Sequence, residues 1–279
     1  MNRQVITYQR LKELEHLLSE RDKTILHSLN KCRYLSSGHI QRLHFNDRAN
    51  KRSSSRLANR KLAKLQEYGL IHSLERRIGG INHGSDSTIR LLTDAGKTLL
   101  HIRSANYISR KRLYEPSPNF LKHTLEVAEV YVQITEFCRN HGLTHTKTDL
   151  EPACWHDYSV EGSRPVYLKP DLFAVIENDK YEYSCFLEID LNTEAPCVVL
   201  NKCQRYIHYY QAVAEGGDSK VFPLVIWRVP DETRKKSLEQ HIAKCSELQP
   251  KNIFTVVTPD ELEGLLRKGT GATIKKEAV

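Results

Sequence analysis

The stretches that decide the fold are YLKPDLFAVI at residues 167–176 and YEYSCFLEID at residues 181–190. Both are rich in Val, Ile, Phe and Tyr, and the ENDK segment between them is typical of a turn, which predicts two paired β-strands. Side chains alternate across a strand, so Glu188 and Asp190 share one face, and Asp171 lies near the same end of the hairpin. Three carboxylates beside so much apolar surface predict a site for Mg²⁺ or Mn²⁺. An edge strand with solvated acids explains the same spacing equally well.

The segment that follows, residues 198–214, has the pattern of a helix. Four of its polar or aromatic residues fall at positions i, i+4, i+7 and i+8 and share one face: Lys202, Tyr206, Tyr209 and Tyr210. A Pro-Asp pair, a Glu-x-Asp triplet and a lysine-bearing helix, in this order, resemble the PD-(D/E)xK nuclease core. Asp190 stands where that family has its lysine. Lys202 fits the position on the following helix to which some members have moved it.

Length and charge predict two domains. The chain has 279 residues and a formal net charge of +8, and residues 1–115 carry 23 Lys and Arg against 10 Asp and Glu. The N-terminal half is therefore the expected anion-binding half. Pro116 and Pro118 break the chain just after it, which predicts domains over residues 1–115 and 116–265 and a flexible basic tail over residues 266–279.

Composition also bears on location. The chain has no run of eighteen apolar residues, and its first residues lack the apolar region of a signal peptide. We therefore expect a cytoplasmic protein that is not inserted in a membrane. Its seven cysteines include no CxxC pair, which predicts reduced thiols rather than disulfides or a zinc site.

The basic half has the element order of a winged helix-turn-helix. A helix after a Ser19 cap and a short helix after Ser36 precede a third helix over residues 48–64, which holds seven cations and no acid. Gly69 ends this helix, and residues 70–92 form a hairpin that turns at Gly79 and Gly80, the expected wing. The residues predicted to bind DNA are Lys51, Arg52, Arg56, Arg60, Lys61, Lys64, Arg76 and Arg77.

Five short motifs follow one another along the two halves of the chain: RLLTDAGKTLL, HTLEVAEV, KPDLFAVI, FLEIDLNTE and KCQRYIHYY. In this order they resemble the replication-relaxation family, in particular the MobC-type relaxases of mobilizable plasmids. The resemblance implies a winged helix followed by a restriction-endonuclease-like domain with a mixed central sheet flanked by helices. It also implies nicking of one strand at a plasmid transfer origin, with double-stranded and nicked origin DNA, an accessory mobilization protein and a type IV coupling protein as partners.

Residue chemistry predicts a role for each candidate. Asp171 and Glu188 hold the divalent cation, and Asp190 adds a ligand or orients a water. Lys202 stabilises charge that develops on the scissile phosphate. The helix expected over residues 121–138 is predicted to pack on the sheet through apolar residues that include Leu121 and Leu125. From this helix Glu126 or Glu129 completes the site, and the family resemblance favours Glu129. His123 binds DNA or acts as an acid or base, and a capping role explains it at least as well.

Three alternatives stay open. Most relaxases attack DNA through a tyrosine, for which Tyr206, Tyr209 and Tyr210 are candidates, but the chain has no three-histidine motif of the usual kind, so metal-dependent hydrolysis ranks higher. The second alternative is a non-catalytic DNA-binding regulator of replication or transcription whose nuclease-like half only supports the fold. A restriction enzyme of the defence type shares the same core, but it would yield linear DNA. Glu194, between the second strand and its helix, is expected only to open that helix.

Overall fold

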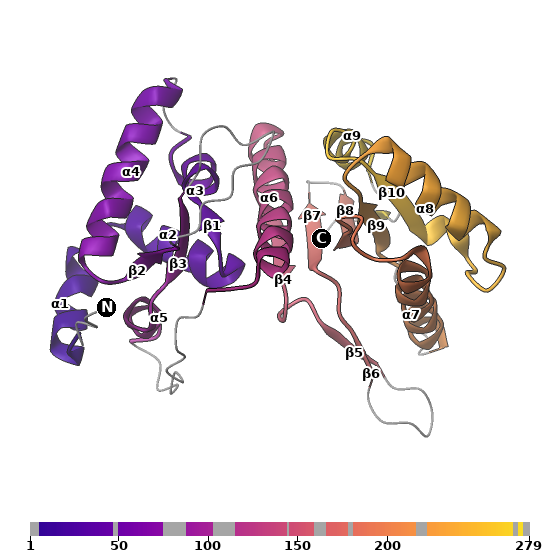
Figure 1. The fold of residues 1–279 in the computed structure, drawn as a ribbon, viewed down its shortest axis with the longest axis horizontal. Coiled ribbons are helices and arrows are strands. Elements are labelled where there is room, and N and C mark those ends of the chain that lie inside the picture. Colours follow the sequence, from indigo (N-terminus) through magenta and orange to yellow (C-terminus); the bar gives the residue numbers. More distant parts are fainter. Residues whose placement is uncertain are drawn as a thin grey trace. The chain divides into compact units, whose positions relative to one another are not determined.

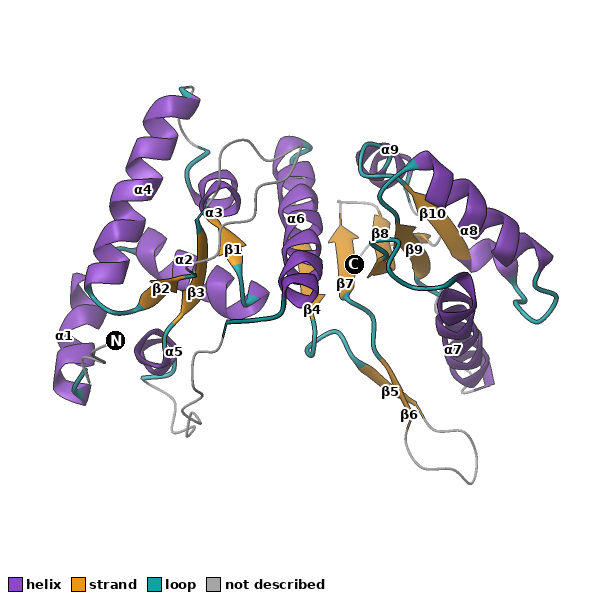
Figure 2. Cartoon of the chain, in the orientation of Figure 1, coloured by secondary structure: helices purple, strands orange, loops and turns teal. Residues whose placement is uncertain are grey.

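The computed structural model describes residues 6–46, 50–74, 88–102, 115–143, 145–158, 166–177, 181–215, 222–269 and 273–275. Within these ranges the chain is a mixed α/β protein with helices and a mixed central β-sheet, as predicted (Figure 2). It divides into two compact units, Met1–Val132 and Gln133–Val279.

The N-terminal unit combines helices with a small antiparallel sheet (Figure 1). Its helices are α1 (Tyr8–Leu17), α2 (Glu20–Cys32), α3 (Ser37–His44), α4 (Lys51–Glu67) and α5 (Asp94–Leu100). Its strands, in the sheet order β1-β3-β2, are β1 (Leu35–Ser36), β3 (Ile89–Leu92) and β2 (Ile71–Ser73). The predicted caps are present, because the Ser19 hydroxyl accepts a hydrogen bond from the Asp22 amide and Ser36 caps α3 in the same way. The turn predicted at Gly79 and Gly80 lies outside the described residues.

Helix α4 buries one side and exposes the other. Leu62 and Leu65 are buried, whereas the side chains at every fourth position from Arg52 to Lys64 face solvent. The helix ends as predicted at Gly69, which has a φ of +70°, a conformation that glycine adopts without steric cost.

Helix α6 (Pro118–Asn140) begins at the second of the two prolines predicted to separate the domains. Its first turns bury Leu121 together with Leu74, Ile89 and Leu91 of the N-terminal unit, and Leu125 packs against the same cluster. The prediction that Leu121 and Leu125 pack on the C-terminal sheet is therefore wrong, because the small sheet of the N-terminal unit supplies their apolar partners. The division between the compact units falls inside α6, after Val132, and the domain bounds predicted from Pro116 and Pro118 stay a prediction.

The sheet of the C-terminal unit has the strand order β10-β9-β8-β7-β4, which is β10 (Phe254–Val257), β9 (Leu224–Arg228), β8 (Tyr181–Ile189), β7 (Leu172–Glu177) and β4 (His145–Leu150). Strands β8, β9 and β10 are parallel, and β7 is antiparallel to both β8 and β4. The predicted hairpin is thus confirmed as β7 and β8, with Leu172 opposite Leu187. The first of the two apolar runs divides at Pro170, and its first part, β6 (Val166–Leu168), pairs with β5 (His156–Tyr158) in a separate ribbon.

Two helices cover one face of this sheet, α7 (Pro196–Glu215) and α8 (Glu232–Lys244) (Figure 1). Trp227 and Phe186 of the sheet share a buried cluster with Cys203 of α7 and Leu238 of α8. A 3-10 turn (Lys251–Ile253) precedes β10, and α9 (Leu262–Lys268) follows it. In the C-terminal tail, residues 266–268 end α9 and β11 (Thr273–Lys275) pairs with the first residues of β8. The flexibility expected for residues 266–279 stays a prediction.

No helix in the described part of the chain is both long enough and apolar enough to cross a membrane.

Candidate active site

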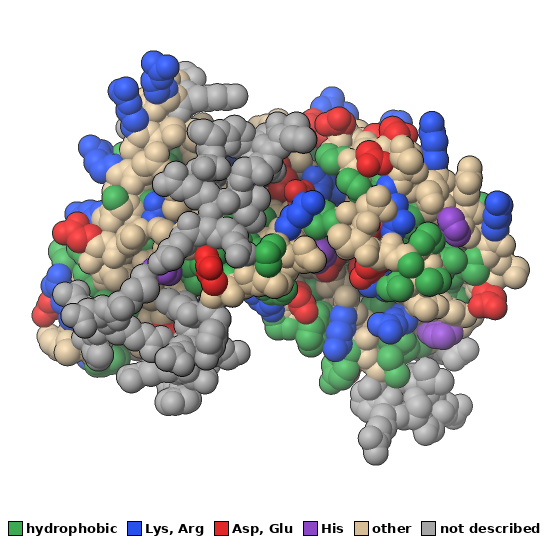
Figure 3. Space-filling view, viewed as in Figure 1, with side chains coloured by type: hydrophobic (Ala, Val, Ile, Leu, Met, Phe, Trp, Pro, Cys, Tyr) green, Lys and Arg blue, Asp and Glu red, His purple; other side chains and the backbone are tan. Residues whose placement is uncertain are grey.

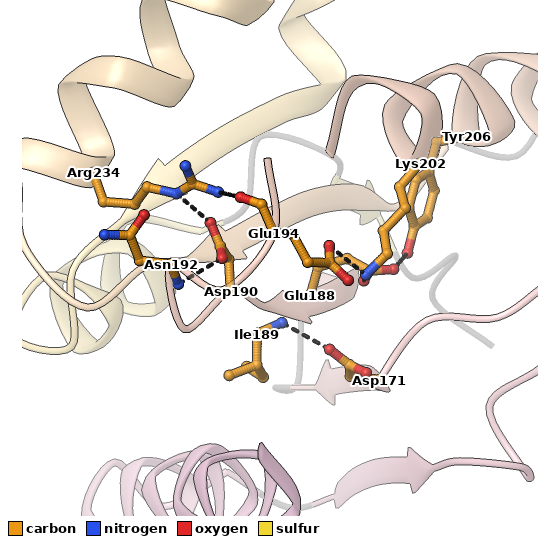
Figure 4. Close-up of polar contacts among 9 residues, drawn as sticks. All are labelled: Asp171, Glu188, Ile189, Asp190, Asn192, Glu194, Lys202, Tyr206 and Arg234. Carbon is orange, nitrogen blue, oxygen red and sulfur yellow. Dashed lines mark hydrogen bonds and ion pairs between the residues drawn. The ribbon is translucent and has the colours of Figure 1, made fainter. Parts of the chain in front are cut away.

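Glu188 is the central carboxylate of the candidate site. It lies in β8, which has strands paired on both sides, and only 4% of its surface is exposed. Its Oε1 accepts a hydrogen bond of 2.6 Å from the Tyr206 hydroxyl, and its Oε2 lies 3.7 Å from Lys202 Nζ (Figure 4). Burial, and next the neighbouring Asp171 carboxylate, raises the pKa of Glu188 to about 8. A buried carboxylate next to a second acid is costly unless a cation compensates the charge.

Lys202 supplies a cation at this place. Its ammonium group lies between two carboxylates, 3.2 Å from Glu194 Oε2 and 3.7 Å from Glu188 Oε2. Burial alone lowers its pKa, but the surrounding carboxylates, led by Glu188, outweigh burial, so the pKa of Lys202 lies above its usual value. Its side chain is 34% exposed, which leaves part of it accessible to a ligand.

Asp171 lies just before β7, the strand that pairs with the Glu188 strand β8. Its Oδ2 accepts a hydrogen bond of 2.8 Å from the Ile189 amide, which fixes the carboxylate at the end of β8 (Figure 4). Its negative charge contributes to raising the pKa values of Glu188, Lys202 and Tyr206. The structure therefore brings Asp171, Glu188 and Lys202 into one electrostatic neighbourhood, as the sequence predicts.

Asp190 belongs to a different group of contacts. Strand β8 ends at Ile189, and the Asp190 carboxylate receives a hydrogen bond of 2.6 Å from Arg234 Nε and one of 2.7 Å from the Asn192 amide. Figure 4 shows it directed to Arg234 and away from Lys202. Asp190 thus pairs with Arg234, whereas Glu188 lies against Lys202, and a metal site shared by Asp190 and Glu188 stays a prediction.

The next question is which side chains of the site could bind a divalent cation. Among the described residues, no three His, Cys, Asp or Glu side chains form a group that could hold a metal ion. The metal-binding role expected of Asp171, Glu188 and Asp190 together stays a prediction. Asp171 and Glu188 still offer oxygen donors beside each other, and Mg²⁺ commonly binds one or two carboxylates together with substrate phosphates. The pair fits such a cation, which would offset the repulsion that raises the pKa of Glu188.

The three tyrosines predicted on α7 have different surroundings. Tyr206 is 1% exposed, and burial, followed by the charge of Glu188, raises its pKa well above the usual value. Tyr209 packs against Phe186 and Phe222, with its hydroxyl 3.3 Å from His156 Nδ1, and burial raises its pKa too. Tyr210 packs edge-on against Phe222. Tyr206 and Tyr209 are therefore held in contacts that disfavour the phenolate of a nucleophile.

A known family matches most of the chain. The sequence profile described as replication-relaxation matches residues 26–225, most of the chain. The chain belongs to the replication-relaxation family. Membership indicates a role in the replication or mobilization of DNA and confirms the resemblance to this family, while the MobC type stays a prediction. No curated protein and no solved structure matches the chain.

The part of this replication-relaxation protein predicted to bind DNA includes an exposed cationic face on α4. The exposed cations are Arg52, Arg56, Arg60 and Lys64, and blue side chains project from α4 in Figure 3. Lys61 lies on another side of the helix, where its Nζ is 3.0 Å from Asp22 Oδ2. The side chain of Lys51 and all of Arg76 and Arg77 lie outside the described residues.

Two further predicted residues of the family member lie on the part of α6 that belongs to the N-terminal unit. Glu129 is buried; its carboxylate receives hydrogen bonds of 2.7 and 2.9 Å from Arg42 Nη1 and lies 3.2 Å from His39 Nε2. These contacts join α3 to α6 and give Glu129 a structural role, while its part in catalysis stays a prediction. His123 is half-buried near the start of the same helix.

Sequence reasoning missed two residues that shape the site of this replication-relaxation protein. It assigned Glu194 to the start of α7, whereas the Glu194 carboxylate lies against Lys202. It gave Arg234 no role, because the ion pair with Asp190 joins positions 44 residues apart. The spacing of Glu194 and Lys202, eight positions apart around the start of one helix, was the signal available for the first of them.

Proposed function

We propose that this protein is a MobC-type relaxase: it nicks one strand at a plasmid transfer or replication origin by metal-dependent phosphodiester cleavage and so initiates conjugative mobilization. The observation that carries this proposal is the placement of Lys202 Nζ 3.7 Å from the buried carboxylate of Glu188, with Asp171 fixed on the neighbouring strand. This is the set of groups that phosphodiester cleavage needs: oxygen ligands for a divalent cation and a positive charge for the phosphate.

The N-terminal unit is proposed to be the winged-helix module that binds double-stranded origin DNA. Its helices α2, α3 and α4 precede a two-stranded hairpin, the element order of that motif. Helix α4 is proposed as the recognition helix, because it exposes four cations along one face, has no acid from Lys51 to Lys64, and buries its apolar side. Each cation that contacts a phosphate adds to affinity and to salt dependence.

The C-terminal unit is proposed to be the restriction-endonuclease-like domain. The support is its mixed sheet, with an antiparallel hairpin (β7 and β8) extended by parallel strands, and acids at the ends of those neighbouring strands. Lys202 on α7 takes the role that a strand lysine has in most members of that superfamily. Asp190, held by Arg234, is left out of the ligand set.

In the proposed reaction a water attacks the scissile phosphorus, the bond to the leaving oxygen breaks, and one strand is cut. Asp171 and Glu188 would hold a divalent cation, which would supply positive charge to the phosphate and lower the pKa of water. The Lys202 ammonium group, whose pKa lies above its usual value, stays charged and stabilises negative charge on the phosphate oxygens. The Tyr206 hydroxyl donates to Glu188 and holds that carboxylate in place. Its burial and raised pKa support hydrolysis over a tyrosyl link.

The test is a nicking assay on supercoiled plasmid that carries the origin, with Mg²⁺ or Mn²⁺ and end-labelling of the product. We expect conversion to open circle by the wild type, loss of conversion in Asp171→Asn and Lys202→Ala, and DNA binding that fluorescence anisotropy shows to be unchanged. Asp260→Asn, the same change at an exposed acid before α9, is the matched control. A product that stays covalently joined to protein, or nicking that survives Asp171→Asn, contradicts the proposal.

A second candidate is a non-catalytic regulator of replication or transcription with a degenerate nuclease fold. The absence of a three-ligand metal group among the described residues favours it. It predicts origin binding with no conversion of supercoiled DNA under any divalent cation, so the same assay separates the two candidates. Under the relaxase proposal, an accessory mobilization protein and a type IV coupling protein are the expected partners.

A further inference from the structure

Arg234 joins α8 to both ends of the loop between β8 and α7. Its own position is fixed at the start of α8, where its amide donates to the capping carboxylate of Asp231. The guanidinium Nε donates a hydrogen bond of 2.6 Å to Asp190 Oδ2, and Nη2 donates one of 2.8 Å to the Glu194 carbonyl (Figure 4). Both Arg234 and Asp190 are buried, at 6% and 4% exposed. One side chain therefore fixes the first and last parts of this loop.

The loop itself has an unusual backbone. Asn192 has a φ of +60°, in the left-handed region that non-glycine residues adopt only at a cost. Its amide donates a hydrogen bond of 2.7 Å to Asp190 Oδ1, so the carboxylate that Arg234 holds also holds this turn. The Asp190 amide in turn donates to the Arg228 carbonyl of β9. The loop conformation thus depends on the Asp190 carboxylate, and the orientation of that carboxylate depends on Arg234.

At the far end of the loop lies the acid that contacts the candidate catalytic lysine. Glu194 Oε2 is 3.2 Å from Lys202 Nζ, closer than Glu188. Glu194 is 38% exposed, so neighbouring packing constrains its side chain little, and the main-chain bond from Arg234 is what fixes its Cα. If Glu194 were displaced, Lys202 would keep only its ion pair with Glu188, and its ammonium group would shift.

We propose that Arg234 is a positioning residue, which sets the place of the Glu194 carboxylate beside Lys202 by holding Asp190 and the Glu194 main chain. The expected effect on nicking rests on the proposed function, whereas the expected effect of Arg234 on the loop between β8 and α7 does not. The competing explanation is that the ion pair between Arg234 and Asp190 only anchors α8 to the sheet. In that case Arg234 and Glu194 act independently.

A double-mutant cycle on the full-length protein separates these explanations. Arg234→Lys keeps a positive charge opposite Asp190, but one amine cannot reproduce the two directed bonds of the guanidinium group. Glu194→Gln removes the charge that faces Lys202. We expect each change to slow nicking by about 10- to 100-fold, the scale of a misplaced catalytic group, and the double variant to be no slower than the slower single one. Effects that multiply in the double variant would overturn the proposal.

Hydrogen exchange supplies a readout that does not require nicking. In Arg234→Lys we expect faster amide exchange at residues 191–195, with β8 and α8 unchanged, and Arg267→Lys on the exposed side of α9 is the matched control. Unchanged exchange in the loop contradicts the proposal whatever the nicking result. A wild type that does not nick refutes the proposed function, and the exchange result then decides the positioning role alone. If Arg234→Lys does not fold, Asp190→Asn takes its place in both experiments, since it weakens the same ion pair.

Discussion

Glu129 makes the N-terminal unit sensitive to acid, and Glu129→Gln measures how much. Burial by itself raises the pKa of Glu129, but hydrogen bonds from His39 and Arg42 outweigh burial and bring the pKa to about 2, from a usual value near 4.5. A folded-state pKa below the unfolded value contributes stability above pH 4.5, and this stability is lost as the pH falls through 2. The difference between the two values corresponds to about 3 kcal/mol at neutral pH. Solvent screening at the 35% exposed Arg42 side chain lowers the expected value to about 2 kcal/mol.

The assay is urea unfolding of the wild type and Glu129→Gln at pH 7 and pH 3, followed by far-UV circular dichroism and by tryptophan fluorescence. Both tryptophans, Trp155 and Trp227, lie in the C-terminal unit, so their signal is an internal control that the substitution should leave unchanged. Because the folded and unfolded states differ in the pKa of Glu129, the difference in free energy of unfolding between wild type and Glu129→Gln should shrink by about 1 to 2 kcal/mol from pH 7 to pH 3. A difference that is the same at both pH values would refute the reasoning, as would a change confined to the tryptophan signal.

Three further predictions follow from other contacts. Gly96→Ala should lower the melting temperature by several degrees, because the added Cβ would lie 2.2 Å from the Leu70 carbonyl oxygen, whereas Gly264→Ala, with open space around it, should not; thermal unfolding by circular dichroism compares them. Tyr206→Phe should destabilise the C-terminal unit by about 1–3 kcal/mol in urea, through the loss of a buried hydrogen bond, and should slow nicking without abolishing it; complete loss of nicking would favour a tyrosyl nucleophile. Arg56→Ala should reduce the slope of log affinity against log salt by about 1 for duplex DNA in fluorescence anisotropy, and an unchanged slope would remove this residue from the interface.

Local sequence patterns predicted most of the elements around the site. The β-branched and aromatic runs at residues 172–177 and 181–189 form the expected hairpin, and the periodicity after them forms α7. Polar caps such as Ser19 and the helix stop at Gly69 lie where the sequence places them. These features depend on neighbours within a few positions, which a single sequence displays directly.

Contacts between distant positions could not be predicted in the same way. Nothing local in the sequence shows that Arg234, on a later helix, pairs with Asp190. Glu129 lies on an amphipathic helix whose polar positions look alike in sequence, and its partner Arg42 is 87 residues away. The apolar face of α6 was assigned to the wrong sheet for a similar reason, because an apolar stripe does not identify its partner.

The pairing of β11 with β8 has a practical consequence for handling the protein. Strand β9 pairs with β8 only from residue 185 onward, and β11 pairs with residues 181–183, so the two strands together cover most of this edge of β8. Cutting the chain after Gly269 would leave those amide and carbonyl groups as an open strand edge, where a second copy could add and start aggregation. Purification tags and truncations are therefore better placed at the other terminus.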